Sequence, residues 1–308
     1  MENNVLITGV AGFIGSNLAK KFLKEGYKVI GIDNLSSGKI ENIPKKVEFI
    51  NGDLCDKNIF NQIKLYCPYI LHLAGQSSGE ISFEDPVDDI RKNTISTLNL
   101  IKFGINNGSQ KIVYASSMSV YGKSQNKLAN ENDKLSPLSC YGISKLSSEK
   151  YLDLFSTQLP YVSLRMFNVY GPGQDLNNLK QGMVSIYLSQ ALKTKNICVK
   201  GSLERYRDYI FIDDTVEAWY KVTLSDNIYN TAINIGTGEK TSVKSLLEII
   251  KSKIANTDYY VTGSTPGDQH GIVADNYKLK GIMKISEFTK IETGIEKYLS
   301  TLKINIQN

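Results

Sequence analysis

The chain has 308 residues, a length that allows one large domain or two modest ones. Hydrophobic residues make up 41% and charged residues 22%, a balance that is typical of globular proteins and excludes a disordered chain. The formal net charge of +5 is mild and no long basic run is present, so we expect no nucleic-acid partner.

Membrane, disulfide and metal-binding classes are also disfavoured. No apolar run reaches the roughly eighteen residues of a membrane span, and no charged-then-apolar leader precedes the first motif. We therefore expect a cytoplasmic protein without a membrane partner. Widely spaced cysteines predict reduced thiols at Cys55, Cys67, Cys140 and Cys198. With only His72 and His270 as histidines, we expect no metal site.

The first half of the chain alternates strand and helix signals. Amphipathic segments predict helices over residues 12–25 and 93–106. Short apolar runs predict strands over residues 5–7, 28–32, 47–50, 69–73 and 111–115. Such alternation is typical of βαβ units, and it predicts an α/β fold with a doubly wound parallel sheet covered on both faces.

The rhythm becomes less regular after residue 165. Helices are predicted over residues 183–192 and 243–254, and a strand over 209–212. We predict a Rossmann dinucleotide-binding domain over residues 1–165, with return segments from later in the chain. A smaller, interleaved substrate-binding region is predicted over residues 166–308.

Three glycines separate the first strand from the first helix. Gly9 permits a tight turn, Gly12 lets the backbone approach a pyrophosphate, and Gly15 lets the helix pack on the strand. The N-terminus of that helix then offers N–H donors to the phosphates. This spacing in this context predicts a dinucleotide site.

Two aspartates indicate which dinucleotide binds. Asp33 closes the second strand, where a carboxylate accepts hydrogen bonds from the ribose hydroxyls and repels a 2′-phosphate. Asn34 and Leu35 follow it instead of an arginine, which favours NAD over NADP. Asp53, after the third strand, is a candidate acceptor for the adenine amino group.

Tyr141 and Lys145 form a Tyr-x-x-x-Lys pair, which lies on one face of a helix. A free tyrosine is a poor base at neutral pH, but a nearby ammonium favours the phenolate. Ser116 and Ser117 follow a predicted strand and place a hydroxyl at the carboxyl edge of the sheet. Together these residues predict proton transfer to and from a sugar hydroxyl.

With these motifs the chain resembles the extended short-chain dehydrogenase/reductases, also called the NAD-dependent epimerase/dehydratase family. The resemblance covers nearly the whole chain and is closest to UDP-sugar 4-epimerases. Further matching segments are residues 72–75, 93–100, 116–122, 165–172, 207–214, 234–238 and 266–268.

The resemblance implies roles for individual residues. Ser117 takes the place of the Ser/Thr that hydrogen-bonds the C4 hydroxyl, Tyr141 that of the base, and Lys145 that of the residue which lowers the pKa of the tyrosine and holds the nicotinamide ribose. Asn168 and Arg207 resemble substrate contacts, with the arginine on the diphosphate. Besides Gly9, Gly12, Gly15, Asp33, Asp53, Tyr141 and Lys145, cofactor contacts are expected from Phe13, Ile14, Asn34, Ser36, Gly38, Leu54, Leu73, Ala74, Gly75, Asn93 and Phe167.

Departures from the family's patterns narrow the reaction. Met118 and Ser119 stand where its dehydratases carry an Asp-Glu pair, and no cysteine follows Ser117 as in the GDP-fucose synthase type. Thr265 replaces an arginine that commonly clamps the diphosphate, and residues 76–80 are more polar than usual. The resemblance therefore implies an epimerase rather than a dehydratase, and leaves the nucleobase and the sugar open.

We expect an NAD-dependent nucleotide-sugar 4-epimerase, with a UDP-hexose as substrate. A nucleotide-sugar 4-dehydrogenase or 4-keto reductase uses the same residues and stays an alternative, as does a non-catalytic NAD-sensing regulator. In the family, helices that correspond to residues 93–106 and 139–157 form a homodimer interface. The apolar positions of the second helix fit either that interface or the chain's own sheet: Tyr141, Leu146, Tyr151, Leu152 and Phe155.

Overall fold

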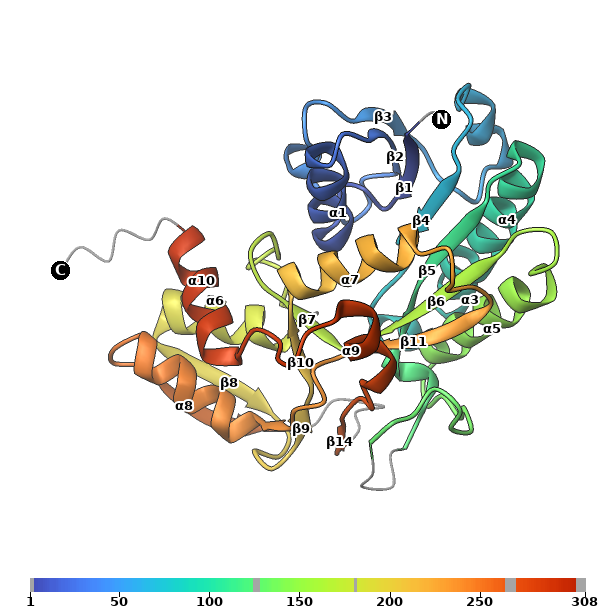
Figure 1. The fold of residues 1–308 in the computed structure, drawn as a ribbon. Coiled ribbons are helices and arrows are strands. Elements are labelled where there is room, and N and C mark those ends of the chain that lie inside the picture. The colour runs from blue at the N-terminus through green and yellow to red at the C-terminus, as the bar shows by residue number, and fades with distance from the viewer. Residues whose placement is uncertain (1–2, 124–127, 180–181, 264–269, 303–308) are drawn as a thin grey trace.

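A parallel sheet of seven strands crosses the middle of the molecule (Figure 1). The structure, a computed structural model, describes residues 3–123, 128–179, 182–263 and 270–302. From edge to edge the strands are β11 (Thr231–Ile235), β6 (Tyr161–Met166), β5 (Lys111–Ser117), β4 (Tyr69–His72), β1 (Asn4–Thr8), β2 (Lys28–Asp33) and β3 (Glu48–Asn51). The strand order reverses between β1 and β4, where ligands bind in sheets of this kind.

Helices cover both faces of this sheet (Figure 1). One face carries α1 (Phe13–Lys24), α7 (Ile212–Leu224) and α9 (Tyr277–Met283). The other face carries a continuous helical run and its neighbour: α3 (Pro86–Ile90), the π-helical turn η3 (Arg91–Ile95), α4 (Ser96–Asn107) and α5 (Cys140–Leu154). The predicted α/β fold with a doubly wound parallel sheet is confirmed.

The alternation of side chains along β1 shows why both faces are apolar. Val5 and Ile7 pack in the core beneath α1 and α7, whereas Leu6 packs in the core beneath α4 and α5. Successive residues of a strand point to opposite faces, so a strand that is covered on both sides is apolar throughout. This explains the uninterrupted apolar runs in the first half of the sequence.

The sheet is completed by a segment from far along the chain. Strand β11 pairs in parallel with β6, and their registers match Thr231 to Val162 and Ile235 to Met166. On β5, the buried ammonium of Lys111 donates to backbone carbonyls at the end of α7, including those of Val222 and Thr223 at 3.2 Å each. Residues after 165 therefore belong partly to the central sheet, and the predicted boundary at 165 stays a prediction.

Small sheets and three helices form the remaining lobe. The strands pair as β7 (Asn168–Tyr170) with β10 (Tyr209–Phe211), β8 (Asn196–Lys200) with β13 (Asp258–Thr262), and β9 (Tyr206–Arg207) with β12 (Thr241–Ser242) and β14 (Gly271–Ile272). The helices are α6 (Met183–Thr194), α8 (Val243–Lys253) and α10 (Ile291–Thr301). Short connecting elements are η1 (Ile40–Asn42), η2 (Lys57–Gln62), α2 (Ile81–Glu84) and η4 (Met118–Val120).

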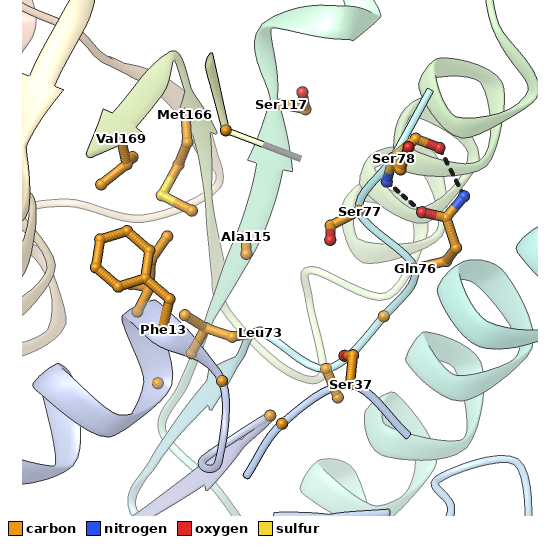
Figure 2. A pocket seen from close by; sticks show the side chains of 18 of the residues that line it. Phe13, Ser37, Leu73, Gln76, Ser77, Ser78, Ala115, Ser117, Met166 and Val169 are labelled. Carbon is orange, nitrogen blue, oxygen red and sulfur yellow. Dashed lines mark hydrogen bonds between the residues drawn. The ribbon is translucent and has the colours of Figure 1, made fainter. Parts of the chain in front are cut away.

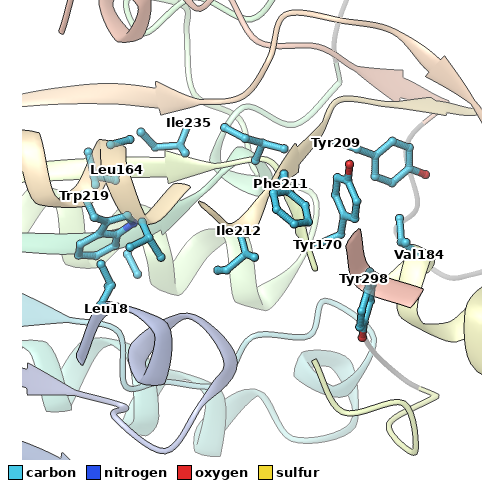
Figure 3. Close-up of a cluster of buried hydrophobic side chains, with 14 of the residues drawn as sticks. Leu18, Leu164, Tyr170, Val184, Tyr209, Phe211, Ile212, Trp219, Ile235 and Tyr298 are labelled. Carbon is cyan, nitrogen blue, oxygen red and sulfur yellow. The ribbon is translucent and has the colours of Figure 1, made fainter. Parts of the chain in front are cut away.

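One hydrophobic core joins this lobe to the sheet. Figure 3 shows Trp219 of α7 near Leu18 and Leu164, while Tyr170 and Tyr298 continue the same cluster toward α10. Because the two regions share their buried side chains, neither has a separate core. In the described part of the chain, no helix is long and apolar enough to cross a membrane.

Candidate active site

A cavity of about 790 Å³ opens at the carboxyl ends of the central strands. Figure 2 shows that its two sides differ in polarity. Apolar side chains gather on one side, and the polar loop after β4 runs along the other: Phe13, Leu73, Met166 and Val169 against Gln76, Ser77 and Ser78. Such a cavity suits a ligand with both flat apolar and polar parts.

The turn from β1 to α1 forms the floor of this cavity. Gly9 has a φ of +70°, and a Cβ there would lie 2.7 Å from the backbone nitrogen of Ala74 in the loop that follows β4. Helix α1 begins after Gly12 without a side-chain cap, so its first N–H groups face the cavity. A helix N-terminus without a cap, approached closely by backbone only, is suited to phosphate binding.

Two carboxylates lie at the end of the cavity beside β2 and β3. Asp33 accepts hydrogen bonds from the backbone nitrogens of Ala11 at 2.9 Å and Leu35 at 2.8 Å, which fixes its carboxylate against the glycine turn. Asp53 accepts from the backbone nitrogen of Cys55 at 2.8 Å. Both line the cavity and are held in place for a polar partner such as a ribose or an adenine.

Helix α5 brings Tyr141 and Lys145 to the cavity. Ser139 caps the helix by accepting from the backbone nitrogen of Gly142 at 3.1 Å, so the helix starts next to the tyrosine. Burial raises the pKa of Tyr141 to about 12, although a hydrogen bond with Ser117 opposes this rise. Burial lowers the pKa of Lys145 to about 8, and the charge of Asp89 opposes that change.

The ammonium of Lys145 uses only part of its hydrogen-bonding capacity within the described residues. Its Nζ donates to the carbonyl of Ala115 at 2.9 Å and lies 5.7 Å from the ring centroid of Tyr141. An ammonium has three donors, so others stay available toward the cavity. A cation at this distance stabilises the phenolate of Tyr141, which is the form that accepts a proton.

The adjacent serines of β5 point in opposite directions. Ser117 lies at the cavity (Figure 2). The hydroxyl of Ser116 instead donates to Glu149 at 2.5 Å, behind the sheet edge. Glu149 also binds Arg165 through two hydrogen bonds, at 3.0 and 2.8 Å. The side chain of Ser117 therefore lies at the cavity, where its catalytic role stays a prediction, whereas the hydroxyl of Ser116 is bound to the buried Glu149–Arg165 ion pair.

Asn93 lies behind Gly75 and supplies a test of cofactor fit. Its side chain is 1% exposed, and its Oδ1 has no hydrogen-bond partner among the described residues. A Cβ at Gly75 would collide with this oxygen and would lie 3.6 Å from Nζ of Lys145. A buried acceptor without a partner is costly, so a donor from a bound group fits here. The site thus suits a dinucleotide, with Lys145 and Asn93 at one end and Asp33 at the other.

Asn168 and Arg207, the predicted substrate contacts, also line the cavity. Asn168 donates to the carbonyl of Asp208 at 3.1 Å, and Nη1 of Arg207 donates to the carbonyl of Tyr206 at 2.7 Å. Burial lowers the pKa of Arg207. Both side chains come from the strands β7 and β9, which the later half of the chain supplies. Thr265 and the segment 266–268 lie outside the described residues.

Except for Asn93, every residue predicted from the sequence as a catalytic, cofactor or substrate contact lines this one cavity. Sequence reasoning missed Asp89, which hydrogen-bonds Asn93, as well as wall residues such as Gln174 and Tyr209. Asp89 had a usable signal, because it precedes Asn93 by four residues and therefore shares its helix face. The wall residues carry no pattern of their own, since the folding of the later lobe places them.

Known proteins resemble this chain over most of its length. A putative UDP-glucose 4-epimerase from Methanocaldococcus jannaschii is 37% identical over 254 residues, which cover 81% of this chain and 82% of that protein. A dTDP-4-dehydro-6-deoxyglucose reductase from Escherichia coli is 30% identical over 316 residues, which cover 98% of each. The crystal structure of UDP-glucose 4-epimerase from Thermotoga maritima with UDP-glucose has a TM-score of 0.92 at 33% identity, covering 97% of this chain and 100% of that one.

A family model supports the same assignment. It describes the NAD dependent epimerase/dehydratase family and matches residues 5–236, from the first strand to the end of β11. This range includes the glycine turn, Ser117 and the Tyr141–Lys145 pair, which the structure brings to one cavity. The chain is therefore an enzyme of the NAD-dependent epimerase/dehydratase family, with NAD as its cofactor.

Proposed function

We propose that this enzyme is a nucleotide-sugar 4-epimerase, with a UDP-hexose as its substrate. The observation that carries the proposal is the complete set of Ser117, Tyr141 and Lys145 at one cavity, with Met118 and Ser119 at the next positions. The set suffices for moving one proton at a sugar hydroxyl. Loss of water would need an additional acid and base, which these two positions do not provide.

Proton transfer rests on Tyr141 and its neighbours. The ammonium of Lys145 places positive charge close to the phenol of Tyr141, and Ser117 forms a hydrogen bond with the phenol group. Both interactions favour the phenolate. Tyr141 then accepts the proton of the C4 hydroxyl. Bound NAD supplies the hydride acceptor and donor for C4. Tyr141 returns the proton when the 4-keto sugar has turned its other face, so the reaction has no net redox change.

Substrate binding is assigned to Asn168 and Arg207. The planar guanidinium of Arg207 suits the oxygens of a nucleotide diphosphate, and Asn168 lies beside the sugar phosphates in this proposal. We assign the sugar hydroxyls to the polar side of the cavity, which Gln76, Ser77 and Ser78 line (Figure 2). In the Thermotoga maritima epimerase, whose fold is similar, the bound molecule is UDP-glucose.

A 4-keto reductase or 4-dehydrogenase of nucleotide sugars is the second candidate. The Escherichia coli relative, named as a reductase of a dTDP-4-keto sugar, matches nearly the full chain. Both reactions use the same proton-transfer residues. The difference lies in whether the oxidised sugar is reduced again by the same cofactor molecule before release.

A proton NMR time course separates these candidates. Purified protein is mixed with UDP-, GDP-, CDP- or dTDP-hexoses and a trace of NAD⁺, while NADH absorbance is followed in parallel. We expect a new 4-epimer of a UDP-hexose without net NADH. Stoichiometric NADH, or turnover only with excess cofactor, would instead establish the dehydrogenase or reductase. Turnover of any of these substrates also rules out the non-catalytic regulator.

We also propose a homodimer that forms through α3, η3 and α5. These elements expose large apolar side chains on one side of the molecule, among them Val87 (76% exposed), Ile143 (55%) and Leu154 (71%). Of the positions considered from the sequence, Leu146, Leu152 and Phe155 pack in the chain's own core, and Tyr151 is exposed. Sedimentation at micromolar protein should give twice the mass of one chain. The cytoplasmic location stays a prediction.

A further inference from the structure

Asp89 is a buried carboxylate next to the catalytic residues, although it does not line the cavity. It lies on α3 and is 1% exposed. Its Oδ1 accepts hydrogen bonds from Nε2 of Gln76 at 3.0 Å and from Nδ2 of Asn93 at 3.1 Å. Its Oδ2 has no hydrogen-bond partner within the part of the chain that the structure describes. Burying a carboxylate is costly unless partners compensate its charge, and Asp89, unlike a fully paired buried carboxylate, leaves one oxygen without any among the described residues.

One hydrogen bond of Asp89 leads to the sugar-facing side of the cavity. Gln76 also donates to the carbonyl of Ser78 at 2.7 Å, and its Oε1 accepts from the backbone nitrogen of Ser78. Figure 2 shows this closed ring of bonds in the loop that runs past Ser77. Asp89 therefore fixes Gln76, and Gln76 fixes the loop of residues 76–79.

The other hydrogen bond leads to the catalytic helix. Nδ2 of Asn93 donates both to Asp89 and to the hydroxyl of Ser144 at 3.0 Å, and that hydroxyl donates to the carbonyl of Tyr141 at 3.0 Å. Because these two acceptors hold the NH₂ group, Oδ1 of Asn93 must point the other way, toward Gly75 and Lys145. Asp89 thereby orients the amide that lies behind Gly75 of the cavity wall.

The charge of Asp89 also acts on the catalytic pair. This charge raises the pKa of both Tyr141 and Lys145. Burial has the larger effect on each group: it raises the pKa of Tyr141 and lowers that of Lys145. Burial raises the pKa of Asp89 itself, while Lys145 lowers it. Other titratable groups surround this cluster: Asp88 and Lys92 on α3 and η3, His72 on β4 and Tyr114 on β5. Of these, His72 is neutral, because burial lowers its pKa to about 3.

We propose that Asp89 is a positioning residue, which joins the loop of residues 76–79 to the Tyr141–Lys145 pair and sets the pH range in which that pair works. The proposal rests on the proposed function, since the pair must act on a sugar held against the loop. It assigns two effects to one side chain: the hydrogen bonds hold the loop, and the charge acts on the pair.

Asp89→Asn separates the charge from the hydrogen bonds. The amide oxygen still accepts from Gln76 and Asn93, but the negative charge is gone. Deprotonation of the Tyr141–Lys145 pair becomes easier, so the acid limb of the kcat/KM profile should shift to lower pH by about one unit. Asp88→Asn is the matched control: it removes the same charge one residue away, from a half-exposed pair with Lys92 at the cavity wall, where solvent screens that charge from the Tyr141–Lys145 pair. In this control the acid limb of the kcat/KM profile should stay at its wild-type pH.

Gln76→Met tests the hydrogen bonds that hold the loop of residues 76–79. It removes the bonds from Gln76 to Asp89 and Ser78 and keeps the charge of Asp89. KM for the nucleotide sugar should rise about tenfold while the acid limb stays in place. An acid limb that stays at its wild-type pH in Asp89→Asn would overturn the electrostatic role. An unchanged KM in Gln76→Met would overturn the role of these hydrogen bonds. Circular dichroism confirms that each variant is folded.

A titration without turnover separates this proposal from the proposed function. Tyrosine labelled with ¹³C at Cζ reports ionisation in the NAD complex, and the resonance of Tyr141 is the one missing from Tyr141→Phe. Its midpoint should move to lower pH in Asp89→Asn and stay unchanged in Asp88→Asn. If no nucleotide sugar is turned over but this shift occurs, the epimerase assignment fails and the role of Asp89 stands. Equal midpoints would overturn the role of Asp89, whatever the substrate.

Discussion

Helix α5 carries two buried charges one turn apart, and their surroundings are opposite. The carboxylate of Glu149 accepts two hydrogen bonds from Arg165 and one from Ser116. Nη1 of Arg165 in turn donates to the hydroxyl of Tyr121 at 3.1 Å and to the carbonyl of Glu131 at 3.0 Å. Around Lys145, the ammonium donates to one carbonyl, that of Ala115. Oδ2 of Asp89 and Oδ1 of Asn93 nearby have no partner among the residues that the structure describes.

The pKa directions follow from this contrast. Burial alone would lower the pKa of Arg165, but the hydrogen bonds and charge of Glu149 raise it above its usual range. For Lys145 burial prevails, and the pKa falls to about 8. A buried charge with all its partners stabilises one conformation, whereas a buried charge with open donors and acceptors stays available for a ligand. We therefore expect the cluster around Glu149 to stabilise the fold and the cluster around Lys145 to take part in the proposed reaction.

The largest effect should come from the cavity side of this comparison. Tyr141→Phe removes the proton acceptor and changes the shape of the side chain very little. Turnover should fall by about a thousandfold or more, while NAD binds with nearly its original affinity. Initial rates on the substrate found by NMR, together with calorimetric titration of NAD, check this outcome. Wild-type turnover by the variant would show that another group is the base.

Removing a charge from each cluster should separate stability from activity. Arg165→Met leaves Glu149 buried without its partner and should lower the free energy of unfolding by about 3–5 kcal/mol. Lys145→Met removes a charge that burial already disfavours, so it should abolish turnover and leave the stability equal or higher. Urea denaturation of the cofactor-free proteins measures both. A large loss of stability in Lys145→Met would mean that Lys145 belongs to the scaffold.

The pH dependence of the free energy of unfolding gives a further test of whether burial of the Lys145 ammonium costs stability. The pKa of Lys145 is about 8 in the folded protein, against an ordinary value of 10.5, so the folded state binds this proton more weakly than the unfolded chain does. The cost of burying the ammonium is then fully present below pH 8 and disappears as the pH rises from 8 to 10.5. Any stability advantage of Lys145→Met over the wild type should therefore be largest below pH 8 and shrink above it.

The smallest effects concern the two neighbouring serines. Ser116→Ala removes one hydrogen bond to the carboxylate of Glu149 and should cost about 1–2 kcal/mol of stability with little change in turnover. Ser117→Ala should do the reverse, with a loss of about a hundredfold in turnover and less than about 1 kcal/mol in stability. Thermal unfolding and initial rates of both variants decide the matter. Similar profiles for the two serines would contradict their opposite orientations.

The sequence predicted the regular half of the molecule better than the irregular half. The strands over residues 5–7 and 28–32 are found, as β1 and β2, because short continuous apolar runs between helices are typical of buried parallel strands. Strands β6 and β11 were not predicted, since Ser163, Arg165 and Asn234 interrupt their apolar pattern with buried polar side chains. Arg165 and Asn234 bind distant partners, which no local pattern shows.

The candidate site divides in the same way. The residues of the glycine turn and the Tyr141–Lys145 pair follow short-range spacing rules, so they were found from the sequence. Asp89 was missed because its importance lies in contacts with Gln76 and Asn93 that only the folded chain reveals. The opposite directions of Ser116 and Ser117 likewise depend on where α5 packs against β5.

The late arrival of β11 has a consequence for synthesis of the protein. A nascent chain that has left the ribosome as far as residue 166 contains β6, but the edge of β6 has no partner until residues 231–235 emerge. The ammonium of Lys111 also lacks the carbonyls of Val222 and Thr223 for most of that interval, until α7 has emerged. For about a fifth of translation the growing sheet thus exposes an open edge, the kind of surface on which chains join one another. Pauses in elongation between β6 and β11 should therefore lower the yield of native enzyme.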